Sequence, residues 1–165
     1  MATRLLIEEE TGATPRVAGE RLTRRSAERV QFIDVTESVR DLVRRSGVRH
    51  GLVSVQTHHT TTGIVVNENE PLLLADLKAL LERLAPSGSR YAHNDLSRRV
   101  DPAPDESANG DAHCRALLLG SSESLSVVDG ELILGAWQRV FFVELDGPRT
   151  RTLSILVVGV SGSGQ

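Results

Sequence analysis

The chain has 165 residues, 39% of them hydrophobic and 25% charged, with a formal net charge of −3 at pH 7. This composition predicts an ordinary globular protein and argues against a nucleic-acid-binding protein, which usually carries a basic surface. No apolar run approaches the roughly 20 residues needed to span a bilayer, so no membrane partner is expected. The single cysteine excludes an internal disulfide, and the first residues lack a secretory signal. A cytoplasmic protein is therefore expected.

The sequence is predicted to form one domain with two short ends. Residues 1–16 are polar, which indicates a tail or an edge extension. Residues 17–160 carry the regular hydrophobic patterns and contain no internal repeat. Residues 161–165 read Ser-Gly-Ser-Gly-Gln, the composition of a flexible end.

The domain begins with two predicted strands and a helix. The strands are expected over residues 17–23 and 28–34, with a turn between them. Asp34 or Thr36 is expected to cap the helix, which runs to about Ser46.

A polar block at residues 57–62, Thr-His-His-Thr-Thr-Thr, joins the next two predicted strands. Residues 51–56 alternate apolar and polar side chains, and residues 63–66 include a β-branched run that should be buried. Surface turns normally use Asn, Asp, Gly or Pro rather than imidazoles and hydroxyls. The block is therefore either part of a binding site or a threonine-rich strand end with packed histidines.

The next helix has the clearest pattern in the chain. Asn69 or Glu70 is expected to cap it, and Pro71 suits its first turn. Leucines recur on one face at helical spacing, at Leu73, Leu77, Leu80 and Leu84.

Residues 87–110 lose this periodicity. A structureless loop of this length is uncommon inside a domain unless it is functional or disordered. It contains His93 and Asp95, and His113 follows near the start of a short helix predicted over residues 111–119. Two histidines, each close to an aspartate, favour a loop that forms a site.

The chain then returns to strands. Residues 125–128 and 131–134 flank an Asp-Gly pair, a strong hairpin signal. A second hairpin is predicted from residues 137–145 and 150–158, whose last strand is apolar on both faces and should be covered on both. About eight strands and three helices, with hairpins dominating, predict an α+β fold of mainly antiparallel sheets.

Three histidines are candidate metal ligands because of their positions. His59 lies at a strand end, His93 in the long loop and His113 at a helix start. Three imidazoles and an open position suit a catalytic zinc site, and imidazole also binds Co²⁺ or Ni²⁺. Asp95 could orient one ring. No local metal motif is present, so scattered surface or capping histidines are the alternative.

Other polar residues are candidates for substrate binding or catalysis. Glu68 is a candidate general base, although it could simply lead into the next helix. The pair of serines after Gly120 could donate hydrogen bonds to a phosphate or merely follow a helix end. The substrate-binding candidates are Asn67, Ser121, Ser122, Gln138 and Arg139.

Several ordered pieces of the sequence resemble the YjbQ-like family of small proteins, whose members are described as secondary thiamine-phosphate synthases. These pieces are His59-Thr60-Thr61 with Gly63, Asn67-Glu68-Asn69, Tyr91-Ala92-His93-Asn94-Asp95, Ala112-His113, Leu118-Leu119-Gly120-Ser121, Gly130-Glu131-Leu132, Leu134-Gly135-Ala136-Trp137-Gln138 and Glu144-Leu145-Asp146-Gly147-Pro148-Arg149. Together they span roughly residues 17–160 in the family's order.

The resemblance implies an α+β fold with a β-sandwich-like core, a homotrimer, and a histidine cluster that holds a divalent metal ion, with zinc expected. The matching ligand positions are His59, His93 and His113, with Asp95 close by. The sequence departs from the family in the longer, polar segment 96–110. Asn109-Gly110-Asp111 also stands where members often have Met-Pro before Ala-His.

The reaction implied is displacement of pyrophosphate from hydroxymethylpyrimidine diphosphate by a thiazole phosphate, which yields thiamine phosphate. A small phosphorylated metabolite is thus the expected partner. Glu68 and Asp95 are the catalytic candidates. The alternatives are a metal-dependent hydrolase of a small phosphorylated metabolite and a trimeric ligand-binding protein without enzymatic activity.

Overall fold

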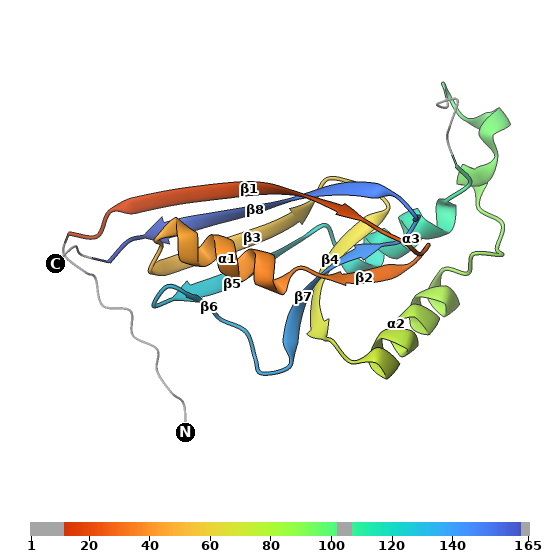
Figure 1. Ribbon diagram of the computed structural model, residues 1–165. Helices are drawn as coiled ribbons and strands as arrows, with labels where there is room; N and C mark the ends of the chain where they lie inside the picture. The colour runs from red at the N-terminus through yellow and green to blue at the C-terminus, as the bar shows by residue number, and fades with distance from the viewer. Residues whose placement is uncertain (1–11, 102–106, 163–165) are drawn as a thin grey trace.

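The computed structural model describes residues 12–101 and 107–162, which form eight strands, three α-helices and two short 3₁₀ turns (Figure 1). The predicted tail and flexible end lie partly outside these residues. The first strand, β1 (Pro15–Arg25), already begins inside the segment that the sequence predicted as a tail.

The strands form two antiparallel sheets that curl into a half-barrel. The larger sheet has the order β1-β8-β3-β5-β6, with β8 (Thr150–Val160), β3 (His50–Thr57), β5 (Ser122–Val128) and β6 (Glu131–Leu132). The smaller sheet has the order β2-β7-β4, with β2 (Gln31–Asp34), β7 (Gln138–Glu144) and β4 (Thr62–Glu68). These sheets and three helices confirm the predicted α+β class.

The predicted hairpin between residues 137–145 and 150–158 is wrong, although both strands exist. β7 pairs with β2 and β4, whereas β8 pairs with β1 and β3. The chain therefore changes sheet between β7 and β8, as it does between β1 and β2 and between β3 and β4. A strand pattern and a turn signal identify the strands but not the sheet that each one joins.

A buried polar network ties these three crossings together. Glu144, at the end of β7, is fully buried and accepts hydrogen bonds from Nε and Nη2 of Arg151 at 2.7 and 2.8 Å. The hydroxyl of Ser26, which follows β1, lies 3.3 Å from the same carboxylate. Arg151 also donates to the hydroxyl of Thr61, in the turn between β3 and β4. The Glu144–Arg151 pair thus joins all three crossings.

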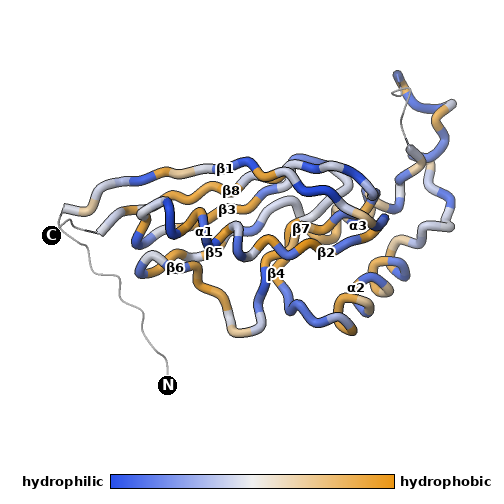
Figure 2. The backbone as a smooth tube through the Cα atoms, viewed as in Figure 1, coloured by the Kyte–Doolittle hydropathy of each residue, from blue (hydrophilic) through white to orange (hydrophobic). Residues whose placement is uncertain are grey.

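Helix α1 (Thr36–Ser46) packs on the larger sheet and fills the half-barrel (Figure 1). Gly47 ends it with a φ of 66°, a left-handed conformation that glycine adopts without strain. The main core combines this helix with both sheets and includes Val39, Leu42, Val53, Ile64, Phe142 and Ile155. Figure 2 shows the corresponding strands as largely hydrophobic through the middle of the molecule.

Helix α2 (Pro71–Leu84) lies at the edge of the molecule (Figure 1). The Glu70 side chain accepts from the backbone N–H groups of Leu72 and Leu73, so this residue is the predicted cap. Only Leu81 is fully buried in α2. Helix α3 (Gly110–Leu119) packs against β4, and the buried Arg115 on it donates to the carbonyl of Ala85 just after α2.

The hairpin between β5 and β6 confirms the signal at the Asp-Gly pair. Asp129 and Gly130 have φ values of 52° and 81°, as a type I′ turn requires. Within residues 12–101 and 107–162, none of the helices is long and apolar enough to cross a membrane.

Candidate functional site

A pocket of about 340 Å³ lies between the turn after β3 and one face of α3. The positions that α3 contributes recur every three or four residues, so they share one helix face. We call this the histidine pocket; its lining is His59, Thr60, Thr62, His113, Ala116, Leu117, Gly120 and Ser121. It includes His59, His113 and Ser121 from the sequence-based candidates, whereas Thr60 and Thr62 were anticipated only as part of a polar block.

Gly63 allows α3 to approach β4 closely enough to form this pocket. A Cβ atom at position 63 would lie 2.8 Å from the Cβ of Leu119. The backbone N–H of Ile64 donates to the carbonyl of Gly120 at 3.2 Å, which joins the strand to the end of the helix. A larger side chain at position 63 would therefore push α3 away from the turn that carries His59.

His59 is held as a neutral ring. Its Nε2 accepts a hydrogen bond from the backbone N–H of Thr152 at 2.9 Å, so the ring proton belongs on Nδ1. Burial, and next the positive charge of Arg151, lower the pKa of His59 from its ordinary value near 6.5. At neutral pH this ring can act as a hydrogen-bond donor through Nδ1.

The long loop brings His93 to α3. Its 3₁₀ turn η1 (Ala92–Asn94) is tied to the helix because the Asn94 side chain accepts from the backbone N–H of Gly110 at 2.8 Å. The rings of His93 and His113 meet edge to face, with centroids 4.6 Å apart. Nε2 of His93 is buried and has no hydrogen-bond partner within the described structure. Such a nitrogen is unusual and needs an explanation, such as a bound water, ion or ligand.

The predicted metal ligands are only partly brought together. Among residues 12–101 and 107–162, no three His, Cys, Asp or Glu side chains lie close enough to hold a metal ion. His93 and His113 are in ring contact, but Nε2 of His59 is already hydrogen-bonded to Thr152. As they lie, these residues do not fit a three-imidazole zinc centre. Zinc binding stays a prediction, which elemental analysis tests beside a variant with alanine at all three positions.

The other predicted residues are distributed over several places. Asp95 follows η1 and accepts from the Ser97 hydroxyl at 2.6 Å, within the second 3₁₀ turn, η2 (Leu96–Arg98). Ser122 begins β5, next to Ser121 in the histidine pocket. The Asn67 side chain accepts from the backbone N–H of Glu68.

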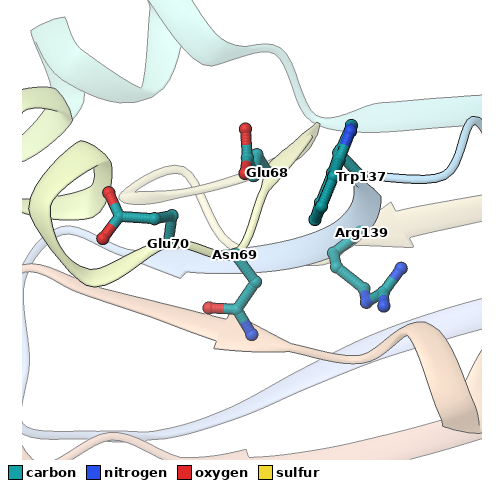
Figure 3. Close-up of a pocket in the computed structure, with 5 residues that line it drawn as sticks. All are labelled: Glu68, Asn69, Glu70, Trp137 and Arg139. Carbon is teal, nitrogen blue, oxygen red and sulfur yellow. The ribbon is translucent and has the colours of Figure 1, made fainter.

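Glu68 and Arg139 line a second pocket, of about 310 Å³ (Figure 3). We call it the tryptophan pocket; its lining is Glu68, Asn69, Glu70, Trp137 and Arg139. Glu68 ends β4, six residues beyond Thr62 in the histidine pocket, a separation of roughly 20 Å along an extended strand. Glu68 and Arg139 therefore belong to a different pocket from His59 and His113.

Sequence reasoning missed the importance of Trp137, because a tryptophan at a strand start is more often part of the core. Here 74% of its surface is exposed. The Gln138 side chain accepts from the backbone N–H of Gly135 at 2.7 Å and fixes the turn before β7, and its part in substrate binding stays a prediction. No local sequence signal predicts that the Trp137 side chain is exposed or that the Gln138 side chain closes a turn.

The fold and its pockets define a small α+β protein with two antiparallel sheets and a polar pocket beside a helix. A family model described as "UPF0047 protein YjbQ-like" matches residues 20–160. The chain belongs to this family, as its resemblance predicted.

Sequence relatives cover most of the chain. A UPF0047 protein of Archaeoglobus fulgidus is 45% identical over 81% of this chain and 96% of its own length. One from Methanothermobacter thermautotrophicus is 38% identical over 90% of this chain and 96% of its own.

Solved structures share the fold. A protein of unknown function from Sulfolobus solfataricus has a TM-score of 0.81 and 28% identity, covering 88% of this chain and 99% of its own. A hypothetical protein from Aeropyrum pernix has a TM-score of 0.77 and 36% identity, covering 86% and 98%.

Proposed function

We propose that the histidine pocket binds a small phosphorylated metabolite and that the protein is a thiamine-phosphate synthase-like transferase. In this reaction the ring nitrogen of a thiazole phosphate attacks the methylene carbon of hydroxymethylpyrimidine diphosphate. The carbon–oxygen bond to the diphosphate breaks, and pyrophosphate leaves with the bonding electron pair. The family resemblance suggests the class of reaction, and the residues that line the pocket favour an anionic ligand.

The observation that carries the proposal is the chemistry of the pocket lining. It contains two imidazoles and the hydroxyls of Thr60 and Ser121, but no carboxylate, and the Thr62 hydroxyl is already bonded to Thr57 and to the carbonyl of His59. An anionic ligand would therefore meet hydrogen-bonding groups without a like charge in the lining. Of the two imidazoles, the neutral His59 ring can donate through Nδ1, because the backbone N–H of Thr152 is bonded to its other nitrogen.

These groups suit a reaction in which negative charge collects on a leaving group. Fixed donors aimed at the departing pyrophosphate would stabilise the transition state more than the substrate. Ser121 follows the end of α3 and His113 lies in its first half, so the two approach the ligand from opposite ends of the same helix face. No described carboxylate in this pocket serves as a base, and the reaction requires none at the attacking nitrogen.

The test is a product assay with purified protein. Hydroxymethylpyrimidine diphosphate and thiazole phosphate together should give thiamine phosphate and pyrophosphate in equal amounts, whereas either substrate alone should give neither. Expression should also rescue a thiamine-auxotrophic host that lacks its own synthase. Release of phosphate or pyrophosphate without the thiazole would indicate a hydrolase instead, and binding without turnover would indicate a ligand-binding protein.

We further propose that the protein is a homotrimer built on the outer face of the larger sheet. The sequence predicted that β8 is covered on both faces, but in one chain Leu156 and Val158 are 44% and 38% exposed. Val158 pairs with Val17 on one side and Leu52 on the other, and both of these are also exposed. Further copies of the chain would cover these exposed apolar side chains. The resemblance to the family suggests that the assembly contains three copies.

The middle of this face, on β8, β3 and β5, is also poor in charge, whereas β1 at its edge contributes the outward Arg21 and Arg25. The outward positions on β8, β3 and β5 include Leu156, Ser154, Ser54, Gln56, Ser122, Ser124 and Ser126. An exposed sheet with apolar and uncharged residues is typical of an interface between subunits.

Replacing Leu156 with arginine should disrupt the trimer, because the new charge would be buried at its centre. Light scattering with size-exclusion chromatography should give three chains of 17.9 kDa for the unaltered protein and a smaller species for the variant. Val100→Arg, a 90% exposed site in the long loop, is the matched control. A monomeric unaltered protein would contradict the proposal.

A further inference from the structure

The tryptophan pocket lies at the ends of β4 and β7, away from the histidine pocket. Its volume of about 310 Å³ is large enough for a small molecule. Figure 3 shows Glu68 and Trp137 directed to the same side of the strand ends, with Arg139 extending to the other side. Glu70 points away toward α2, where it caps the helix.

A closed turn fixes the backbone of Trp137, whose side chain is exposed. Two hydrogen bonds close the turn that contains it: the Gln138 side chain accepts from the backbone N–H of Gly135, and the Gln138 backbone N–H donates to the Gly135 carbonyl at 3.0 Å. An indole with 74% of its surface exposed on a fixed turn offers a flat face for a cation or a ring.

The two charged side chains of the pocket are not paired with each other. In the described part of the chain, no ion pair involves Glu68 or Arg139, and the guanidinium of Arg139 donates only to the carbonyl of Gln138. By contrast, Asn69 is engaged with Asp34, and Glu70 with the start of α2. The groups left to meet a ligand are one carboxylate, one guanidinium and one indole.

We propose that the tryptophan pocket binds a small zwitterion. Its cationic end lies against the indole of Trp137 and the carboxylate of Glu68, and its anionic end reaches around the strand ends to Arg139, which lines the same pocket from the other side. A carboxylate beside an aromatic face recognises an ammonium group, while a guanidinium recognises a carboxylate or phosphate. A ligand with one charge would satisfy only one of these two groups.

The proposal is tested with three related probes: phosphocholine, choline and inorganic phosphate. Trp137 is the only tryptophan in the sequence, so intrinsic fluorescence reports on this pocket alone. Phosphocholine should bind about tenfold more tightly than either choline or phosphate, because it adds a second contact of moderate strength. Calorimetry of the same titrations measures binding without relying on the indole.

Two variants separate the contacts. Glu68→Gln should weaken phosphocholine and choline but not phosphate, and Arg139→Gln should weaken phosphocholine and phosphate but not choline. Val100→Ala, at a 90% exposed site in the long loop that lines neither pocket, should change none of the three affinities. Equal affinity for all three probes, or unchanged phosphocholine binding in both charge variants, would overturn the proposal. Synthesis of thiamine phosphate is measured separately, so either proposal can fail without the other.

Discussion

Replacing Glu144 with alanine is expected to lower the free energy of unfolding by about 3–5 kcal/mol, a large share of the stability of a domain this size. The change leaves the guanidinium of Arg151 buried without its carboxylate. It also removes the acceptor that serves the backbone N–H groups of Leu145 and Asp146. Because Ser26 and Thr61 join the same network, the sheet crossings should loosen together.

Chemical denaturation monitored by circular dichroism measures this effect. The matched control is the double variant with Glu144→Leu and Arg151→Met, which removes both charges and keeps most of the volume. Since a buried ion pair can often be replaced by apolar residues at little cost, the double variant should be more stable than Glu144→Ala. If Glu144→Ala were as stable as the unaltered protein, the network would not hold the crossings.

Replacing His113 with alanine is expected to lower kcat/KM for thiamine phosphate formation by about 10²–10³-fold, the usual cost of losing one fixed donor at a developing anion. His113 lines the histidine pocket and packs edge to face on His93, so the variant loses both a polar group and the support of a neighbouring ring. The measurement is steady-state turnover with both substrates.

His50→Ala is the matched control, because His50 begins β3 at the end opposite the histidine pocket. It should retain turnover within about twofold of the unaltered protein, because the largely buried His50 ring lies outside the histidine pocket. Equal losses in the two variants would show that His113 acts through general stability. An unchanged kcat/KM in His113→Ala would contradict a role of the histidine pocket in the reaction.

The helices were predictable because their signals are local. Glu70 caps α2 through hydrogen bonds to residues two and three positions away, and Gly47 ends α1 through its own backbone conformation. The turn at Asp129 and Gly130 is equally local. Such features depend on residues within one or two turns of each other, so the printed order of residues specifies them.

The histidine pocket was only partly predictable. The sequence singled out the polar block around His59 and the loop around His93; the structure places His59 in the histidine pocket and His93 against His113. Their relation to one another was not predictable, because it depends on Gly63 bringing α3 close to β4 and on Asn94 bonding to Gly110. Glu68 and Arg139 were grouped with the histidines, whereas the structure places them in the tryptophan pocket.

The sequence by itself determined the strands, the helices, the α+β class and the family, because period, caps and ordered motifs are properties of neighbouring residues. Only the tertiary structure decided which sheet each strand joins and which polar residues share a pocket. Those outcomes depend on contacts between distant positions, such as Glu144 with Ser26 and Arg151 with Thr61, which no pattern of neighbouring residues predicts.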